Sequence, residues 1–141
     1  MTTAHLRAHY YWRRGDTDAA QKAARDILER APQHLDTRIL LASLAADANR
    51  YEEALTRLAG LDSTRDDQVS RILSEHALSV EDSTKAISIL ESRKKALQGW
   101  LPATLRELLV SAYRAAEQPE KAQELEQNSL NAQATRKRSA L

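Results

Sequence analysis

The amino-acid sequence predicts an all-α fold built from antiparallel helix hairpins. Of its 141 residues, 24 are Ala and 20 are Leu, whereas eight are Val or Ile and none is Phe. A β-sheet is rich in β-branched and aromatic residues, and Ala and Leu favour helices instead. Apolar residues also recur at spacings of three and four, as in Leu40, Leu41, Leu44 and Ala45, which is the period of an amphipathic helix.

An internal repeat divides the chain into four similar segments. In each segment an apolar stretch leads to a polar break, and an alanine then opens a second apolar stretch. These alanines are Ala20, Ala54, Ala86 and Ala122, at intervals of 34, 32 and 36 residues. A period near 34 that contains two short helices is typical of a stacked array of helical hairpins.

The period predicts the domain organisation. We expect one repeat domain over residues 1–134, with repeats at about 1–34, 35–66, 67–102 and 103–134. A basic disordered tail is expected to follow over residues 135–141, because polar residues lead there into Arg136, Lys137 and Arg138.

Turn-forming residues place the ends of four helices in the first half of the chain. Gly15 can take the left-handed conformation that ends a helix, and Asp16 or Asp18 can cap the next one. Pro32 closes the first hairpin. The helices expected here are residues 3–14, 17–30, 35–48 and 51–60.

The second half of the chain has fewer turn signals. Asp82 or Ser83 can start a helix, and Pro102 and Pro119 suit a first helical turn. We expect Trp100 to pack into the irregular junction before Pro102. The helices expected here are residues 66–79, 82–97, 102–116 and 119–134.

Small residues recur where the two helices of a hairpin must approach closely. A contact position without bulk lets two helix backbones come near each other, and a larger side chain there would overpack the site. The pairs that we expect to face each other are Ala8 with Ala20, Ala42 with Ala54, and Ser74 with Ala86.

These residues resemble the tetratricopeptide repeat family. The matching residues are Ala8, Tyr11, Gly15, Asp16, Ala20, Ala24 and Pro32 in the first repeat, and Leu41, Ala42, Tyr51, Ala54, Leu58 and Leu61 in the second. The third and fourth repeats are degenerate, since neither has Gly at its turn and Val110 stands where the family prefers a small residue. The resemblance implies a right-handed superhelical solenoid, TPR-like in its hairpins.

The resemblance also implies a concave groove, lined by the first helix of each hairpin, that binds an extended peptide or a partner helix. The groove residues would be His5, His9, Trp12 and Arg13, then Ile39, Leu40, Ser43 and Asp47, then Arg71, Ile72 and Glu75, and finally Glu107, Ser111 and Arg114. Such a mixed lining suits a peptide held by a few anchors, with charge setting its register. The alternative is that these are ordinary solvated helix faces.

Leu6 and Tyr10 mark a second candidate surface. They lie on the helix face that would contact a preceding repeat, and Met1 begins the chain there. Terminal repeats usually have a polar outer face. We therefore expect this face to be buried, either in a homodimer formed through the N-terminal helix or by upstream sequence; the alternative is a short exposed patch.

The sequence argues against an enzyme and against a metal or other cofactor. The glycines are isolated rather than clustered into a phosphate-binding loop, and cysteine is absent. His5 and His9 are spaced to chelate a metal, but Leu6 stands where the zincin motif has Glu, and no third ligand is near. We expect no catalytic, cofactor-binding or metal-binding residues.

Charge and hydropathy limit the partners. The net charge is +1, and the basic run at 136–138 contributes three positive charges, so the rest of the chain carries about −2. That balance is not typical of nucleic-acid binding, and the pentatricopeptide alternative would read only one base per repeat. No apolar run approaches the roughly 20 residues that span a bilayer, so we expect no membrane insertion.

The expected function is therefore a protein-interaction module that serves as an assembly scaffold, an adaptor or a small chaperone. Two alternatives stay open: a segment of a larger periplasmic repeat protein for envelope assembly or polysaccharide export, and a homo-oligomerisation module. The first reading implies a cytoplasmic location and the fragment reading a periplasmic one. The Arg- and Ala-rich composition suggests a bacterial protein.

Overall fold

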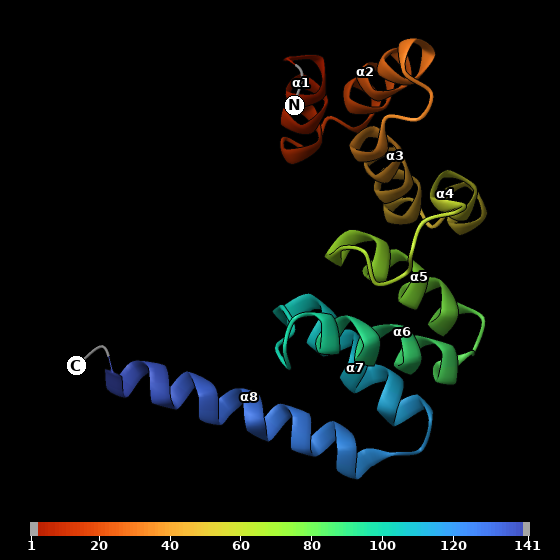
Figure 1. Cartoon of the computed structure of the whole chain (residues 1–141). Coiled ribbons are helices and arrows are strands. Elements are labelled where there is room, and N and C mark those ends of the chain that lie inside the picture. Colours follow the sequence, from red (N-terminus) through yellow and green to blue (C-terminus); the bar gives the residue numbers. More distant parts are fainter. Residues whose placement is uncertain (1–2, 140–141) are drawn as a thin grey trace. The chain divides into compact units, whose positions relative to one another are not determined.

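The computed structural model describes residues 3–139, with side chains described as far as residue 135, and every regular element in that range is an α-helix (Figure 1). The helices are α1 (Thr3–Arg13), α2 (Thr17–Arg30), α3 (Leu35–Asp47), α4 (Tyr51–Leu58), α5 (Asp67–Ser79), α6 (Ser83–Ala96), α7 (Ala103–Ala115) and α8 (Pro119–Ser139). This confirms the all-α fold class. None of the helices described is both long and apolar enough to cross a bilayer.

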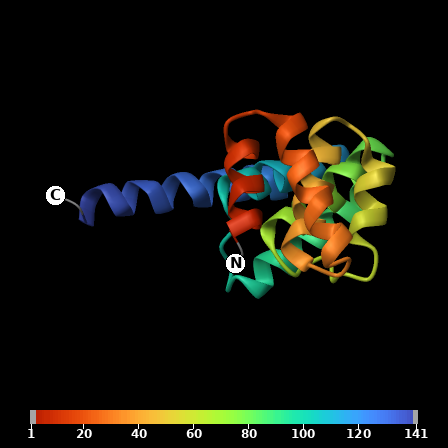
Figure 2. The same ribbon diagram turned by 90° about the horizontal axis from the view of Figure 1, so that it is seen from above.

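The end of α8 differs from the sequence-based expectation. The helical backbone continues to Ser139 instead of ending at residue 134, so it enters the segment that we expected to be a disordered tail. Residues 140–141 lie outside the described range. Because α7 has 13 residues and α8 has 21, the second half of α8 runs past α7, as Figures 1 and 2 show.

The chain divides into two compact units, Met1–Asp62 and Ser63–Leu141. Unit 1 holds the hairpins α1–α2 and α3–α4, and unit 2 holds α5–α6 and α7–α8. Within unit 1 the second helix of one hairpin packs on the first helix of the next, α2 on α3. Within unit 2 α6 packs on α7 in the same way.

The turn inside each hairpin has the same backbone geometry. In every hairpin the second residue past the end of the first helix has a positive φ. These residues are Gly15 at 77°, Asn49 at 60°, Glu81 at 59° and Glu117 at 59°. The amide of the next residue then donates to a carbonyl five residues back, in the pairs Asp16 to Tyr11, Arg50 to Ala45, Asp82 to Ala77 and Gln118 to Tyr113, at 2.8–3.0 Å. This is the Schellman pattern that ends a helix. Because the two degenerate repeats share it, their helix ends can be aligned with those of the first two repeats.

Aspartates cap three of the helices. The side chains of Asp16, Asp66 and Asp82 accept backbone amides of the first turns of α2, α5 and α6, at 3.2, 2.8 and 3.1 Å respectively. Each cap satisfies an amide that has no partner within its own helix. Asp16 and Asp82 are thus the caps among the alternatives that the sequence offered.

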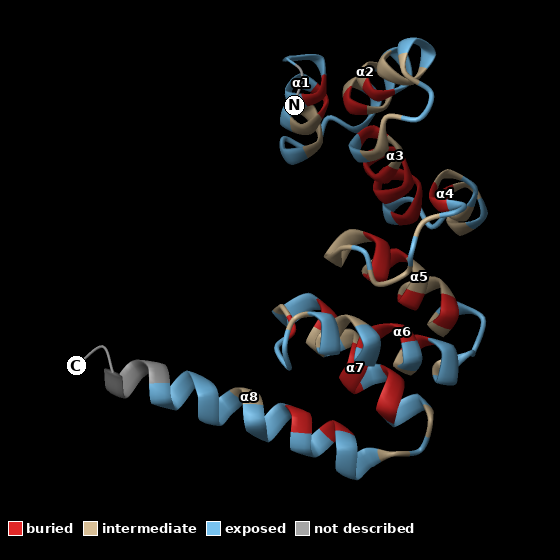
Figure 3. Ribbon diagram, viewed as in Figure 1, coloured by how far each residue is buried: buried red, intermediate tan, exposed pale blue. Residues whose placement is uncertain are grey.

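The small residues of each hairpin lie in the interior, as Figure 3 shows for the buried segments. The six residues of the three expected pairs are fully buried: Ala8, Ala20, Ala42, Ala54, Ser74 and Ala86. In unit 1, Ala8 and Ala20 share a core with Leu40, Leu41 and Leu44 of α3. The Ser74 hydroxyl donates to the Ser70 carbonyl at 2.6 Å, so this buried polar group is satisfied within its own helix.

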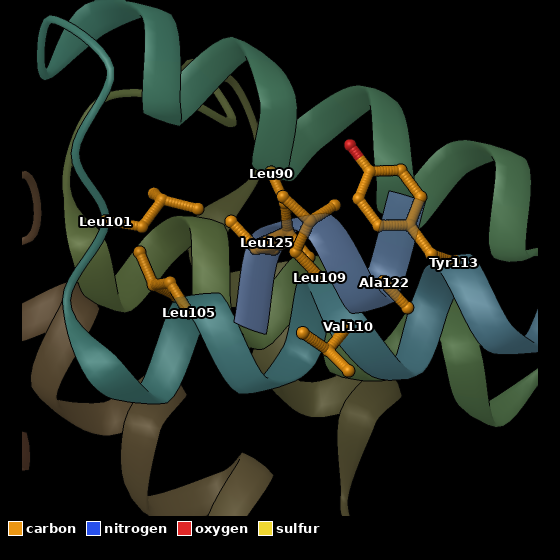
Figure 4. Close-up of a cluster of buried hydrophobic side chains, with 8 residues drawn as sticks. All are labelled: Leu90, Leu101, Leu105, Leu109, Val110, Tyr113, Ala122 and Leu125. Carbon is orange, nitrogen blue, oxygen red and sulfur yellow. The ribbon is translucent and has the colours of Figure 1, made fainter. Parts of the chain in front are cut away.

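A hydrophobic core of unit 2 lies between α6, α7 and α8 (Figure 4). It contains Leu90, Leu101, Leu105, Leu109, Val110, Tyr113, Ala122 and Leu125. Leu101, which is 3% exposed, fills the junction between α6 and α7, whereas Trp100 is 52% exposed. The expectation that Trp100 packs into this junction is therefore wrong, because its neighbour occupies the apolar space.

The shared turn geometry predicts that glycine is the better residue at two positions. Glu81 and Glu117 are exposed and hold a left-handed backbone that side chains with a Cβ disfavour. Glu81→Gly and Glu117→Gly should each raise the free energy of unfolding by about 0.5–1 kcal/mol. Urea denaturation followed by far-UV circular dichroism measures this change.

Glu124→Gly provides the matched control, since Glu124 is exposed in the interior of α8. It should lower the free energy of unfolding by about 1 kcal/mol. Equal destabilisation by all three variants would contradict the turn assignment.

Candidate functional site

In unit 1, side chains of α1 meet side chains at the start and end of α3. We call this surface the α1–α3 patch; its residues are His5, His9, Trp12, His34, Thr37 and Asp47. His9 lies between two of the rings, 4.4 Å from the His5 centroid and 5.8 Å from that of Trp12. The spacings of four and three residues place the three α1 rings on one face of the helix.

Thr37 ties His5 to His34 at the buried end of the patch. The Thr37 hydroxyl oxygen lies 3.3 Å from His5 Nδ1 and 2.7 Å from His34 Nδ1, and the two rings are 5.3 Å apart. A hydroxyl has a single proton and can donate only once. At least one of the two imidazoles therefore carries its proton on Nδ1 and donates to Thr37.

Burial disfavours protonation of the two α1 histidines. Burial lowers the pKa of His5 below its usual value, and nearby His9 and His34 lower it further. Burial also lowers the pKa of His9, with a contribution from Arg13. The carboxylate of Asp36 opposes both shifts but does not reverse them.

Trp12 occupies the opposite end of the patch. Its indole N–H donates to Asp47 Oδ2 at 3.4 Å, which links the last turn of α1 to the last residue of α3. Part of the ring packs against the core of unit 1, and part is exposed. The patch thus presents an aromatic surface whose position is fixed from two helices.

The structure buries half of the groove residues that the sequence predicts in unit 1. His5, Ile39, Leu40 and Ser43 are each at most 8% exposed. The other four stay accessible: His9 and Trp12 are half-buried, and Arg13 and Asp47 are exposed. The expectation that all eight residues face a partner is corrected accordingly.

The reason lies in α3. All its residues from Ile39 to Ala46 are buried, so no polar stripe distinguishes one face of this helix from another. The one hydroxyl in that stretch, on Ser43, donates to the Ile39 carbonyl at 2.9 Å and does not need a partner from outside.

Unit 2 divides its predicted groove residues in a similar way. Ile72 on α5 is fully buried, and Arg71 forms a half-buried ion pair with Glu75 at 3.1 Å. The three α7 residues Glu107, Ser111 and Arg114 are exposed. Arg114 is paired with Glu126 of α8 at 2.5 Å.

His34 and Thr37 are patch residues that the sequence analysis missed. His34 immediately precedes α3, where its side chain makes no capping bond and contacts Thr37 instead. The repeat length supplies the signal that could have found them, because His5 and Thr37 are 32 residues apart, close to one period.

Leu6 and Tyr10 adjoin the patch on α1. They are 54% and 53% exposed, and they line a hollow of about 310 Å³ together with His9 and Arg13. Arg14 donates to the Tyr10 hydroxyl at 2.7 Å and lies over its ring. The Tyr10 ring is therefore held in place at the surface.

Among the residues that the structure describes, no group of three or more His, Asp or Glu side chains is placed to hold a metal ion.

Comparison with known families identifies the repeat. A family model described as tetratricopeptide repeat matches residues 11–76. This match shows the tetratricopeptide repeat over residues 11–76. The match covers most of the first repeat, all of the second and much of α5, and the turn geometry extends the same hairpin register through α8. Tetratricopeptide repeats generally mediate protein–protein interaction. The comparison with curated proteins finds no match.

The lowered pKa values of His5 and His9 predict an acid-sensitive unit 1. The unfolded chain takes up protons near pH 6.5, whereas the folded patch resists them until lower pH. The free energy of unfolding should therefore fall as the pH drops from about 6.5 through the lowered folded-state pKa values. Trp12 fluorescence in a Trp100→Phe background, followed during urea unfolding at several pH values, measures this dependence.

The double variant His5→Gln and His9→Gln should flatten the pH dependence between pH 7.5 and 5. His76→Gln is the control, because His76 lies on α5 in unit 2. An unchanged slope in the double variant would show that other groups set the acid sensitivity.

Proposed function

We propose that this chain is a non-enzymatic interaction module that holds an extended peptide or a partner helix against the α1–α3 patch. The observation that carries this proposal is Trp12, an indole fixed by Asp47 yet partly open to solvent. Tryptophan is enriched among the residues that dominate binding energies. A ring that is already positioned loses little freedom on binding, which favours affinity.

Charges beside Trp12 would set the direction of the bound segment. Arg13 and Asp47 are both exposed and carry opposite signs. They flank the aromatic ring, one on α1 and the other at the end of α3. Complementary charges on a partner would select its register more than its affinity.

Unit 2 offers a further contact surface of its own. A hollow of about 440 Å³ lies between α7 and α8, and Glu107, Ser111 and Arg114 are among its lining residues. The exposed side chain of Leu130 adds an apolar contact there. The same three α7 residues are those that the sequence places in the groove, which supports their use in partner binding.

A hydrolytic role for the patch has little support. Thr37 contacts two imidazoles, an arrangement that can activate a hydroxyl nucleophile. However, Thr37 and His5 are both fully buried, so a substrate has no access to the hydroxyl. We therefore assign the cluster to structure and the neighbouring Trp12 to binding.

The cellular role that we favour is an assembly scaffold, adaptor or small chaperone in a bacterial cytoplasm. A periplasmic segment of a longer repeat protein would use the same patch in the same way. RNA binding is disfavoured, because the chain outside its C-terminal basic run carries about two net negative charges.

Site-specific photo-crosslinking in native cells tests the proposal. A benzoylphenylalanine at position 13 should capture a protein partner, whereas the same group at the exposed position 25 on α2 should not. Adding Trp12→Ala should reduce the position-13 product by roughly tenfold or more, as for loss of a binding anchor. Identical products at both positions, unaffected by Trp12→Ala, would overturn the patch as the binding site.

A second candidate function is self-association through α1. It is favoured by the exposure of Leu6 and Tyr10, two large side chains one helical turn apart. A second copy covering them would remove both from water and would bury the hollow that they line.

Light scattering of the full chain tests self-association. The double variant Leu6→Ser and Tyr10→Ser should convert a dimer to a monomer. Val80→Ser is the matched control, because Val80 is similarly exposed, at 58%, but lies in unit 2. A monomeric wild-type protein would reject this function and leave the α1–α3 patch as the interaction surface.

A further inference from the structure

Unit 2 contains a pocket that none of the sequence motifs indicated. It has a volume of about 370 Å³ and lies where the loop between α6 and α7 meets the first turn of α7 and the middle of α8. We call it the Trp100 pocket after its largest exposed side chain. Buried Leu101 and Leu125, both labelled in Figure 4, supply apolar lining, and Trp100 is 52% exposed.

The charged side chains that line the pocket are positive. Lys94 and Arg106 both line it, and no Asp or Glu is among its lining residues within the part of the chain described. Arg106 donates one N–H to the Leu101 carbonyl at 3.2 Å, which holds its guanidinium in place at the wall. A guanidinium has five N–H donors, so others are available to an anionic group.

Side-chain amides complete the lining. Asn128 and Gln133 on α8 both face the pocket and are exposed. Each has an amide that donates and accepts hydrogen bonds, as a peptide backbone requires. The volume lies within the range of small binding sites and suits a short stretch of chain.

We propose that the Trp100 pocket binds an acidic peptide segment. Carboxylates of the segment pair with Lys94 and Arg106, and an apolar side chain packs against Trp100 and Leu101. The Asn128 and Gln133 amides bond its backbone. This site is separate from the α1–α3 patch and goes beyond the function proposed above.

The chain has two tryptophans, one in each proposed site, so replacing one lets the fluorescence of the other report on a single site. In the full-length Trp12→Phe variant, Trp100 is the remaining tryptophan and reports on the pocket. The probe is a pool of acetylated, amidated tetrapeptides built from Asp, Glu and Leu, compared with the matched pool of Asn, Gln and Leu. The acidic pool should change Trp100 fluorescence saturably, with an affinity about tenfold above that of the neutral pool, as for loss of charge-assisted hydrogen bonds.

Lys94→Gln should weaken binding of the acidic pool by roughly fivefold to tenfold. Lys95→Gln is the matched control, since Lys95 is its sequence neighbour but does not line the pocket. Equal affinity for both pools, no saturable change, or equal effects of the two lysine variants would overturn the proposal. Inorganic phosphate displacing the peptides at equal concentration would also overturn it, because that would show an anion site without peptide recognition.

Discussion

Close contact between the two helices of each hairpin is the constraint on which the rest of this structure depends. In the first three hairpins a small residue on each side allows this contact, and these alanines and Ser74 are fully buried. It also needs a turn that reverses the chain within a few residues, which the left-handed residue after each first helix provides. At Glu81 and Glu117, where neither glycine nor asparagine is present, the backbone keeps this geometry despite its cost, because hairpin packing compensates for it.

The same constraint builds the candidate site in unit 1. Since each hairpin repeats after about 34 residues, side chains one period apart lie on neighbouring first helices. His5 meets Thr37 after 32 residues, and Trp12 meets Asp47 after 35. The repeat period thus brings together side chains that are far apart in the sequence. The aromatic surface is positioned by contacts from α1 and α3, without any large loop.

The sequence predicted the helices well because their signals are local. Aspartate caps, prolines and the Ala and Leu periodicity placed the start of every described helix within one residue of its position. The exposed site was harder to predict, because α3 is apolar on all sides and hides which of its residues, such as Leu40 or Ser43, turn inward. At Trp100 the sequence favoured burial of the larger residue, but the neighbouring Leu101 is the one that is buried.

The two proposed surfaces would bind partners through different interactions, aromatic contact in one and charge pairing in the other. The α1–α3 patch presents the Trp12 indole beside His5 and His9, whose pKa values burial lowers, so its affinity should depend on shape and dehydration more than on ionic strength. The Trp100 pocket relies on Lys94 and Arg106, whose attraction for carboxylates is screened by salt. Raising the salt concentration would release the acidic segment first and leave the aromatic anchor in place.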